Sequence, residues 1–294
     1  MNSIKIETLI RLSKSEDLPS LHKVWEDVFA SPDKDLFFDY FYKPERCVVA
    51  QVENKVCAMG FILPVGDFVC NGSSYPCAMI YALATLPQYR NYGIGSALVS
   101  KLVLQGQKSG YPVTILCPSS DDVFNYYSSK TEFKDRFYID EKIYSNLPAT
   151  SSSNTHLSDL SAKEYLNLRN YKLAKRTHIE FELSVIEYQK KLCRLTGGDL
   201  YKIDGNGWIG VLAVEKLSDE NIIVNELLCP QECENEVISA ISAIFPGCEI
   251  TVRTPVSFDP NFRENARRFG MMTSCIPEVN DLKLNVAWYG FAFD

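Results

Sequence analysis

The stretch MIYALATLPQYRNYGIGSAL, residues 79–98, decides the fold of this 294-residue chain. Residues 79–86 are almost all apolar, which predicts a strand buried on both faces, and Pro87 ends its hydrogen bonding. A turn with two glycines, Gly93 and Gly95, comes next, and a helix opens at its end. Glycine lets a backbone approach a ligand closely, and a helix N-terminus offers free N–H groups and a positive dipole end. The stretch therefore predicts a site for phosphate.

The composition is that of a globular protein, with 46% hydrophobic and 23% charged residues. The net charge is −7 and no basic cluster stands out, which argues against a nucleic-acid partner. No apolar run approaches the ~20 residues that span a membrane, and the N-terminus lacks the pattern of a signal peptide. We expect a cytoplasmic protein with no membrane partner.

The ten cysteines do not form a metal or disulfide pattern. The sequence has no C-x-x-C pair and no Cys/His cluster, and most cysteines lie in apolar surroundings, as buried free cysteines do. Cys229 and Cys233 stand four residues apart without a second pair nearby. We therefore expect no metal site.

Hydrophobic periodicity predicts the elements of the first half of the chain. Strands are expected at residues 6–12, 46–52, 56–69, 79–86, 113–117 and 133–143, and helices at 18–29, 35–42, 93–107 and 121–129. This order indicates a mixed sheet with helices on its faces. The aromatic residues of the second helix are expected to pack in the core, with a substrate wall as the alternative.

A small, polar segment, LPATSSSNT at residues 147–155, is the expected linker between two domains, 1–146 and 156–294. After it, helices are expected at 162–175, 184–196, 231–245 and 261–269, and strands at 200–203, 208–214, 222–228, 249–253 and 282–293. The element order of the first half thus recurs. The sequence predicts an α/β (α+β) fold of two tandem domains, each a mixed, mostly antiparallel sheet flanked by helices.

The two halves differ where the central strand meets its helix. Leu86-Pro87-Gln88 in the first half corresponds to Cys229-Pro230-Gln231 in the second. Residues 233–236, CENE, then replace the glycine turn with two acids, which would repel a phosphate. We expect one anion site, in the first half, with the second half as a wall that shapes the site for a second substrate.

Two common phosphate motifs are excluded. A P-loop needs Gly-Lys-Ser/Thr, which is absent after these glycines. A dinucleotide fold needs a third glycine, and residues 93–98, GIGSAL, lack it.

The run RNYGIG, residues 90–95, after a strand and a proline, resembles the acetyl-coenzyme A (acetyl-CoA) signature R/Q-x-x-G-x-G/A of the GNAT superfamily of N-acetyltransferases. The element order of residues 1–145 is similar to that fold. The resemblance implies an acetyl-CoA-dependent transfer to a primary amine, on a small molecule or a peptide, by direct attack on the thioester. The turn would bind the pyrophosphate and the strand before it would pair with the pantetheine arm. The implied cofactor-binding residues are Leu83, Ala84, Thr85, Arg90, Asn91, Tyr92, Gly93, Ile94, Gly95 and Ser96.

The family commonly places a tyrosine in a motif F-Y-x-x-x-G-F, where it protonates the departing thiolate. Residues 124–133, FNYYSSKTEF, are similar to it with one extra residue, and Glu132 stands where glycine is usual. Tyr126 and Tyr127 are both eligible, and we favour Tyr127. A phenol of pKa ~10 can donate a proton to a thiolate whose conjugate acid has a pKa of ~8.5. The alternative is that both tyrosines pack against the sheet.

Residues 79–86 contain no carboxylate, so the base that many family members carry on this strand is missing. The tandem arrangement partly resembles acetyltransferases of the enhanced-intracellular-survival type, in which the C-terminal carboxylate reaches the active site. The apolar end of this chain, WYGFAFD, would place the carboxylate of Asp294 there. The missing base also leaves a second hypothesis, a non-catalytic acyl-CoA-binding or regulatory module.

Overall fold

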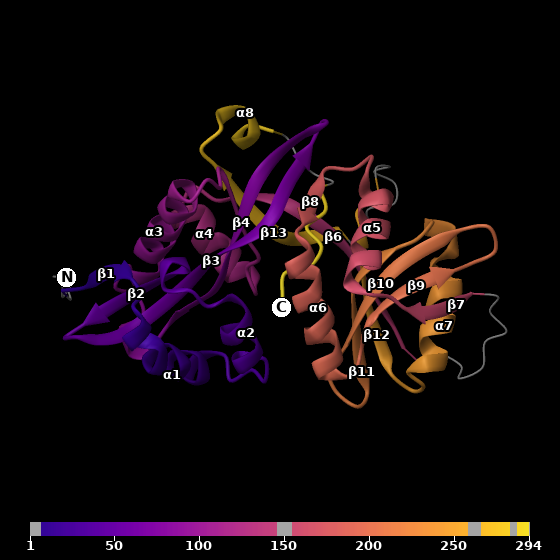
Figure 1. Cartoon of the computed structure of the whole chain (residues 1–294), viewed down its shortest axis with the longest axis horizontal. Coiled ribbons are helices and arrows are strands. Elements are labelled where there is room, and N and C mark those ends of the chain that lie inside the picture. Colours follow the sequence, from indigo (N-terminus) through magenta and orange to yellow (C-terminus); the bar gives the residue numbers. More distant parts are fainter. Residues whose placement is uncertain (1–6, 146–154, 258–265, 283–286, 294) are drawn as a thin grey trace. The chain divides into compact units, whose positions relative to one another are not determined.

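The computed structural model describes residues 7–145, 155–257, 266–282 and 287–293, and its chain forms two compact units (Figure 1). Unit 1 comprises residues 1–66, 75–135 and 271–282. Unit 2 comprises residues 67–74, 136–270 and 283–294. No helix in the described ranges has the length and apolarity needed to cross a bilayer.

The sheet of unit 1 has the strand order β1-β2-β3-β4-β5-β13. The strands are β1 (Leu9–Leu12), β2 (Cys47–Val52), β3 (Lys55–Cys70, in unit 1 to Gly66), β4 (Ser73–Thr85, in unit 1 from Tyr75), β5 (Val113–Leu116) and β13 (Ala266–Ser274, in unit 1 from Met271). Neighbours β1–β2, β2–β3 and β5–β13 are antiparallel, and β4–β5 is parallel. Consecutive residues with positive φ, Glu53-Asn54 and Asn71-Gly72, make the tight turns at both ends of β3.

Helices cover both faces of this sheet (Figure 1). They are α1 (Leu18–Val28), α2 (Lys34–Phe41), α3 (Ile94–Lys108) and α4 (Asp121–Lys130), with the short α8 (Pro277–Asn280) after β13. Alternating residues of β3 serve the two faces: Phe61 packs edge-on against Phe37 of α2, while Ile62 joins the core beneath α3 and α4. Three of the four aromatic residues of α2 are core residues as expected, since Phe37, Phe38 and Phe41 are buried, whereas Tyr40 is half-buried.

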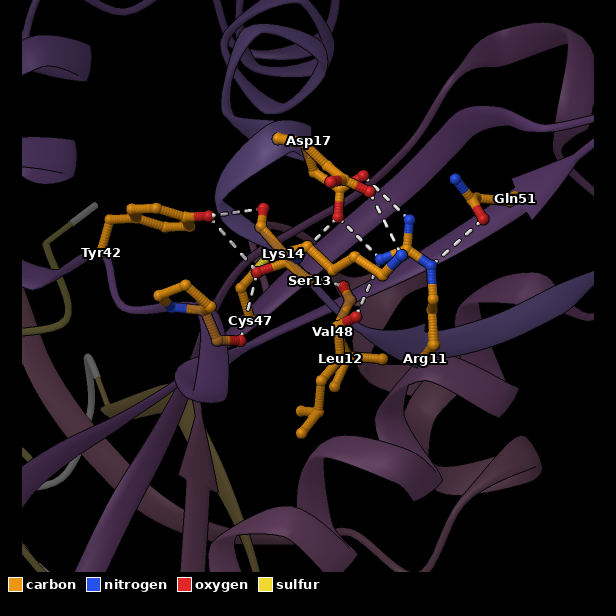
Figure 2. Close-up of polar contacts among 11 residues, drawn as sticks. Arg11, Leu12, Ser13, Lys14, Asp17, Tyr42, Cys47, Val48 and Gln51 are labelled. Atoms are coloured by element: carbon orange, nitrogen blue, oxygen red, sulfur yellow. Dashed lines mark hydrogen bonds and ion pairs between the residues drawn. The ribbon is translucent and has the colours of Figure 1, made fainter.

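A partly buried ion pair fixes the start of α1 to the sheet (Figure 2). Arg11 of β1 donates two hydrogen bonds to the Asp17 carboxylate, at 2.7 and 2.9 Å, and a third to Gln51 Oε1 of β2 at 3.2 Å. The same carboxylate accepts the backbone N–H of Lys14 at 2.7 Å. The short 3₁₀ helix Ser15–Asp17, which leads into α1, is thereby capped and charge-balanced.

The sheet of unit 2 has the order β6-β12-β11-β10-β9-β7. Its strands are β6 (Lys134–Tyr144, in unit 2 from Arg136), β7 (His156–Asp159), β9 (Leu200–Asp204), β10 (Ile209–Lys216), β11 (Asn221–Leu228) and β12 (Glu249–Pro255). The other elements are α5 (Ala162–Leu173), β8 (His178–Phe181), α6 (Leu183–Thr196) and α7 (Glu234–Ile244). Among the paired neighbours, β11–β12 is parallel and β6–β12, β10–β11, β9–β10 and β7–β9 are antiparallel. The predicted mixed, mostly antiparallel α/β fold is confirmed.

The same connection recurs in the two units. In unit 1, β4 leads through a 3₁₀ turn, Pro87–Tyr89, and α3 to the parallel strand β5. In unit 2, β11 leads through a 3₁₀ turn, Gln231–Cys233, and α7 to the parallel strand β12. The correspondence of the two proline-containing junctions, expected from the sequence, is therefore seen in the topology.

Two predicted elements near the C-terminus are wrong. A helix was expected at 261–269, but residues 266–274 form β13, because buried residues such as Phe269 and Met272 pair and pack in a sheet; residues 261–265 lie outside the described ranges. A strand was expected at 282–293, but within 287–293 only Ala287 and Trp288 form isolated bridges. Gly290 and Phe293 have positive φ, which breaks an extended strand.

The last strand of each half of the sequence lies in the unit that is formed mainly by the other half. β6, from the first half of the chain, pairs with β12 in unit 2, and residues 271–274 of β13 pair with β5 in unit 1. Residues 147–154 of the expected linker, 147–155, lie outside the described ranges, and the division into domains 1–146 and 156–294 stays a prediction.

Candidate functional site

The turn between β4 and α3 presents backbone N–H groups at the surface of unit 1. Asn91 and Gly93 have φ of 68° and 77°, in the left-handed region, and Asn91, Tyr92 and Gly93 are exposed. Gly93 is the N-cap of α3, so the N–H groups of the first helical turn, Ile94 to Ser96, have no acceptor within the helix. No acid lies in that turn. The geometry therefore suits an anion.

The two glycines are required for different reasons. A Cβ at Gly93 would meet no atom within 4 Å, so its role is conformational, to allow the positive φ. A Cβ at Gly95 would lie 3.0 Å from the hydroxyl oxygen of Tyr126. The second glycine thus leaves room for Tyr126, which comes from α4.

The strand before the turn separates from its parallel neighbour. β4 pairs with β5 only from Cys77–Val113 to Met79–Ile115, although β4 continues to Thr85. Ala82 has φ of 47°, a conformation uncommon in a strand, and it lies in this unpaired part. The two strands therefore separate here, which leaves one edge of residues 80–85 without a β5 partner.

The predicted pantetheine-contacting residues lie on this unpaired part of β4. Ala84 is buried, whereas Leu83 and Thr85 are half-buried. The side chain of Leu83 approaches Gly60 of β3, because a Cβ at Gly60 would lie 2.7 Å from Leu83 Cδ1. The carbonyl oxygen of Thr85 accepts a hydrogen bond from Arg90 Nε at 3.0 Å, which ties the turn to the strand end. All ten predicted cofactor residues therefore lie on one strand end, one turn and one helix start of unit 1.

The two candidate tyrosines occupy different environments on α4. Tyr127 is 7% exposed and packs in the core, with its ring 6.2 Å from that of Phe133. Burial raises the pKa of the Tyr127 phenol above its ordinary value, so it stays protonated at neutral pH. Tyr126 is 36% exposed, and its hydroxyl is the one that lies against the glycine turn. Their rings are 5.5 Å apart.

Asp294, the third predicted catalytic residue, lies outside the described residues. The segment before it, 287–293, is buried within unit 2, as its apolar sequence indicates. The indole N–H of Trp288 donates to Glu226, and the ring of Phe293 lies 4.9 Å from that of Tyr188.

The junction between β11 and α7 in unit 2 does not offer an anion site. Glu234, the first residue of α7, is 7% exposed. Its carboxylate accepts hydrogen bonds from Lys142 Nζ at 2.9 and 3.0 Å and from the Tyr144 hydroxyl at 2.5 Å. Burial and the neighbouring Glu234 raise the pKa of the Tyr144 phenol. A buried carboxylate of the chain itself therefore lies at this helix start, where it would repel a bound anion.

Three features of these junctions have no local signal in the sequence. The Tyr126–Gly95 contact, the backbone of Ala82 and the neutralisation of Glu234 each depend on residues distant in the chain. The described residues contain no group of three or more His, Cys, Asp or Glu side chains that could hold a metal ion.

Comparisons with known proteins agree with this geometry. A family model described as an acetyltransferase (GNAT) domain matches residues 9–130. A solved GCN5-related N-acetyltransferase from Kribbella flavida is similar over 93% of this chain and 72% of its own, with a TM-score of 0.66 and 16% identity. Another, from Anabaena variabilis, is similar over 90% of this chain and 72% of its own, with a TM-score of 0.66 and 14% identity. Eis1 from Mycobacterium abscessus is similar over 91% of this chain and 73% of its own, with a TM-score of 0.59 and 13% identity. No curated protein matches the sequence.

At these identities the solved structures show the fold, and the family model identifies the region that holds the glycine turn and both tyrosines. Residues 9–130 are therefore a GNAT acetyltransferase domain, in a chain whose fold over about nine tenths of its length is that of larger GNAT N-acetyltransferases.

Proposed function

We propose that the chain transfers an acetyl group from acetyl-CoA to a primary amine of a small molecule or a peptide. The observation that carries this proposal is the glycine turn: Gly93, in the left-handed region, caps α3 beside a strand whose edge is unpaired, inside a GNAT domain. Acetyl-CoA would supply an acetyl group activated as a thioester.

The residues of unit 1 fit this cofactor. The space beside Gly93 is open, and the free N–H groups from Ile94 to Ser96 suit a pyrophosphate. The edge of β4 beyond Met79, where its pairing with β5 has ended, suits the amides of the pantetheine arm, because a strand edge offers main-chain N–H and C=O groups. Arg90, which is exposed, adds a positive charge at the end of the turn.

A tyrosine of α4 would donate the proton that the departing thiolate needs. The contact with Gly95 supports Tyr126, because a donor must reach the bound ligand. Tyr127, the residue favoured from the sequence, packs in the core and stays eligible, since its raised pKa keeps it protonated. The carboxylate of Asp294 is proposed as the group that accepts or relays the proton of the amine.

The test measures release of free thiol from acetyl-CoA with a panel of amines: a peptide N-terminus, lysine, a polyamine and an aminoglycoside. Amine-dependent release is expected with at least one of them. Gly93→Asp should abolish it, because a carboxylate on the turn repels the pyrophosphate. Gly247→Asp is the matched control, since Gly247 has φ of 80° and equally open surroundings in unit 2.

The second candidate is a non-catalytic acyl-CoA-binding or regulatory module. It is favoured by the sequence of β4, which contains no carboxylate to serve as base. Binding of acetyl-CoA without thiol release under any amine would favour this candidate and contradict the transferase proposal. Amine-dependent release that Gly93→Asp and Gly247→Asp reduce equally would contradict the assignment of the turn.

A further inference from the structure

Unit 2 contains a pocket of about 540 Å³ in the fork between β11 and β12. These strands pair only from Asn221–Glu249 to Val224–Val252. Beyond that point Leu227 and Leu228 line one side of the pocket, and Thr254 and Pro255 line the other. The volume is within the range of about 300–1,000 Å³ that is usual for small-molecule sites.

A buried carboxylate in this pocket, that of Asp140, has one oxygen without a hydrogen-bond partner among the described residues. Asp140 of β6 lies opposite Thr254, is 7% exposed, and its Oδ1 has no hydrogen-bond partner among the described residues. The nearest cation, Lys142, is 3.8 Å from the other oxygen and donates its hydrogen bonds to Glu234. An unsatisfied buried acceptor is unfavourable, so Asp140 is suited to accept an N–H or O–H from a ligand. Burial raises the pKa of this carboxyl above its ordinary value.

The pocket has a cationic end next to the C-terminus of α5. Lys172 lines it and makes no ion pair with any described residue, and Arg176 lines it while donating to the carbonyl oxygen of Val256 at 2.8 Å. The start of α7 is taken by Glu234, so an anionic group in the pocket would be placed at Lys172. Between the two polar ends the wall is apolar, with Leu173 and Pro230.

One edge of β11 is free beside these groups. Residues 226–228 pair with β10 on one side, and Asn225 lies at an irregularity of that pairing, while the pairing of β11 with β12 ends at Val224. Such an edge binds extended, amide-bearing chains through main-chain hydrogen bonds.

We propose that this pocket binds an extended small molecule in which secondary amides lead to an anionic group. The amides lie along the free edge of β11, one N–H donates to Asp140 Oδ1, and the anionic group pairs with Lys172. The site is separate from the glycine turn and extends beyond the acetyl transfer proposed above. Two sources share this chemistry: a short peptide with a free C-terminal carboxylate, and an amide chain that ends in phosphate.

The test is calorimetric titration of the full chain carrying Gly93→Asp, which removes the first-unit anion site from the measurement. The probes are N-acetyl-trialanine and 4′-phosphopantetheine, each compared with its uncharged counterpart, the trialanine amide and pantetheine. At least one charged probe should bind, about tenfold or more tightly than its counterpart. Binding of one probe alone supports the proposal and identifies the source.

Variants of the lining residues locate the binding. Lys172→Met should lower the affinity for the charged probe about tenfold. Lys175→Met, at an exposed lysine outside the pocket lining, should leave that affinity unchanged. Asp140→Val should weaken binding and also raise the melting temperature of the empty protein, because it removes an unpartnered buried carboxylate. A purely structural Asp140 would give the opposite shift in melting temperature.

The proposal is overturned if neither probe binds at 10 mM or below, or if Lys172→Met and Lys175→Met act equally. Either result leaves acetyl-CoA binding by the parent chain untouched, so this failure is distinct from a failure of the proposed transferase.

Discussion

At the scale of residues, the site depends on a pair of glycines with unlike roles. The sequence predicted that both would allow close approach of a ligand. In the structure Gly93 supplies a positive φ, while Gly95 leaves space for the Tyr126 hydroxyl. Spacing in the sequence could indicate the turn, because the turn is local. It could not indicate which tyrosine of α4 would lie against it.

Substitution of the two tyrosines separates their roles. Tyr126→Phe should lower kcat by about 100-fold or more with little change in the KM for acetyl-CoA, because a general acid typically contributes 10²–10⁴-fold. Tyr127→Phe should retain most of kcat, since its ring and packing are preserved. Steady-state kinetics of both variants across pH check this.

A larger loss of kcat in Tyr127→Phe than in Tyr126→Phe would identify Tyr127 as the proton donor. In that case the alkaline limb of the kcat profile should lie above the range of an ordinary phenol, because burial raises the pKa of Tyr127.

The ion pair of Arg11 and Asp17 should make a pH-dependent contribution to the free energy of unfolding. Asp17→Asn should lower the free energy of unfolding at pH 7 by about 2–4 kcal/mol, because it leaves a half-buried guanidinium without its charge partner. Arg11 lowers the pKa of Asp17, so this contribution is full above the unfolded-state pKa of ~3.9 and is lost as pH falls through the folded-state pKa.

Urea unfolding at several pH values measures this difference. The gap between the parent and Asp17→Asn should shrink below pH ~4, while Glu16→Gln, on an exposed neighbour, should behave like the parent throughout. A gap that is constant with pH would contradict the role of the ion pair.

At the scale of elements, most helices and strands could be predicted because their periodicity is local. The helix α3 and the strands β2, β3 and β4 lie where the pattern placed them. β13 could not be predicted, since its neighbour β5 lies about 150 residues earlier and sheet pairing overrides local propensity. The local sequence also does not indicate that β6 pairs in unit 2 and that β13 pairs with β5 in unit 1.

A buried ion pair, Arg169 and Glu226, connects α5 to β11 in unit 2. Arg169 and Glu226 are both fully buried, with Nε–oxygen distances of 2.9 and 3.0 Å, and Glu226 also accepts from Tyr165. Arg169→Met should cost about 3–5 kcal/mol of unfolding free energy, because it leaves an uncompensated buried charge.

A double-mutant cycle tests the cause. Arg169→Met combined with Glu226→Gln should be less destabilised than Arg169→Met alone, since the amide is neutral and still accepts from Tyr165. Arg194→Met, at a largely exposed partner of Asp199, is the control and should have a much smaller effect. Equal losses in the single and double variants would show that packing, not charge, is responsible.

At the scale of the whole molecule, the two units repeat one connection with different chemistry at the strand–helix junction. The sequence predicted this difference from the acids at 233–236, and it predicted repulsion of a phosphate. The structure adds that the Glu234 carboxylate is itself bound by Lys142 and Tyr144. The pocket in unit 2 could not be predicted, because Asp140, Lys172 and the end of β11 come from separate parts of the chain.

The central claim is that a single acetyl-CoA binds at the glycine turn, and calorimetric titration of acetyl-CoA into the full chain tests it most directly. We expect one acetyl-CoA per chain, a loss of affinity of about 100-fold or more in Gly93→Asp, and unchanged binding in Gly247→Asp. Two equivalent sites per chain, or equal affinity in the parent and Gly93→Asp, would contradict it.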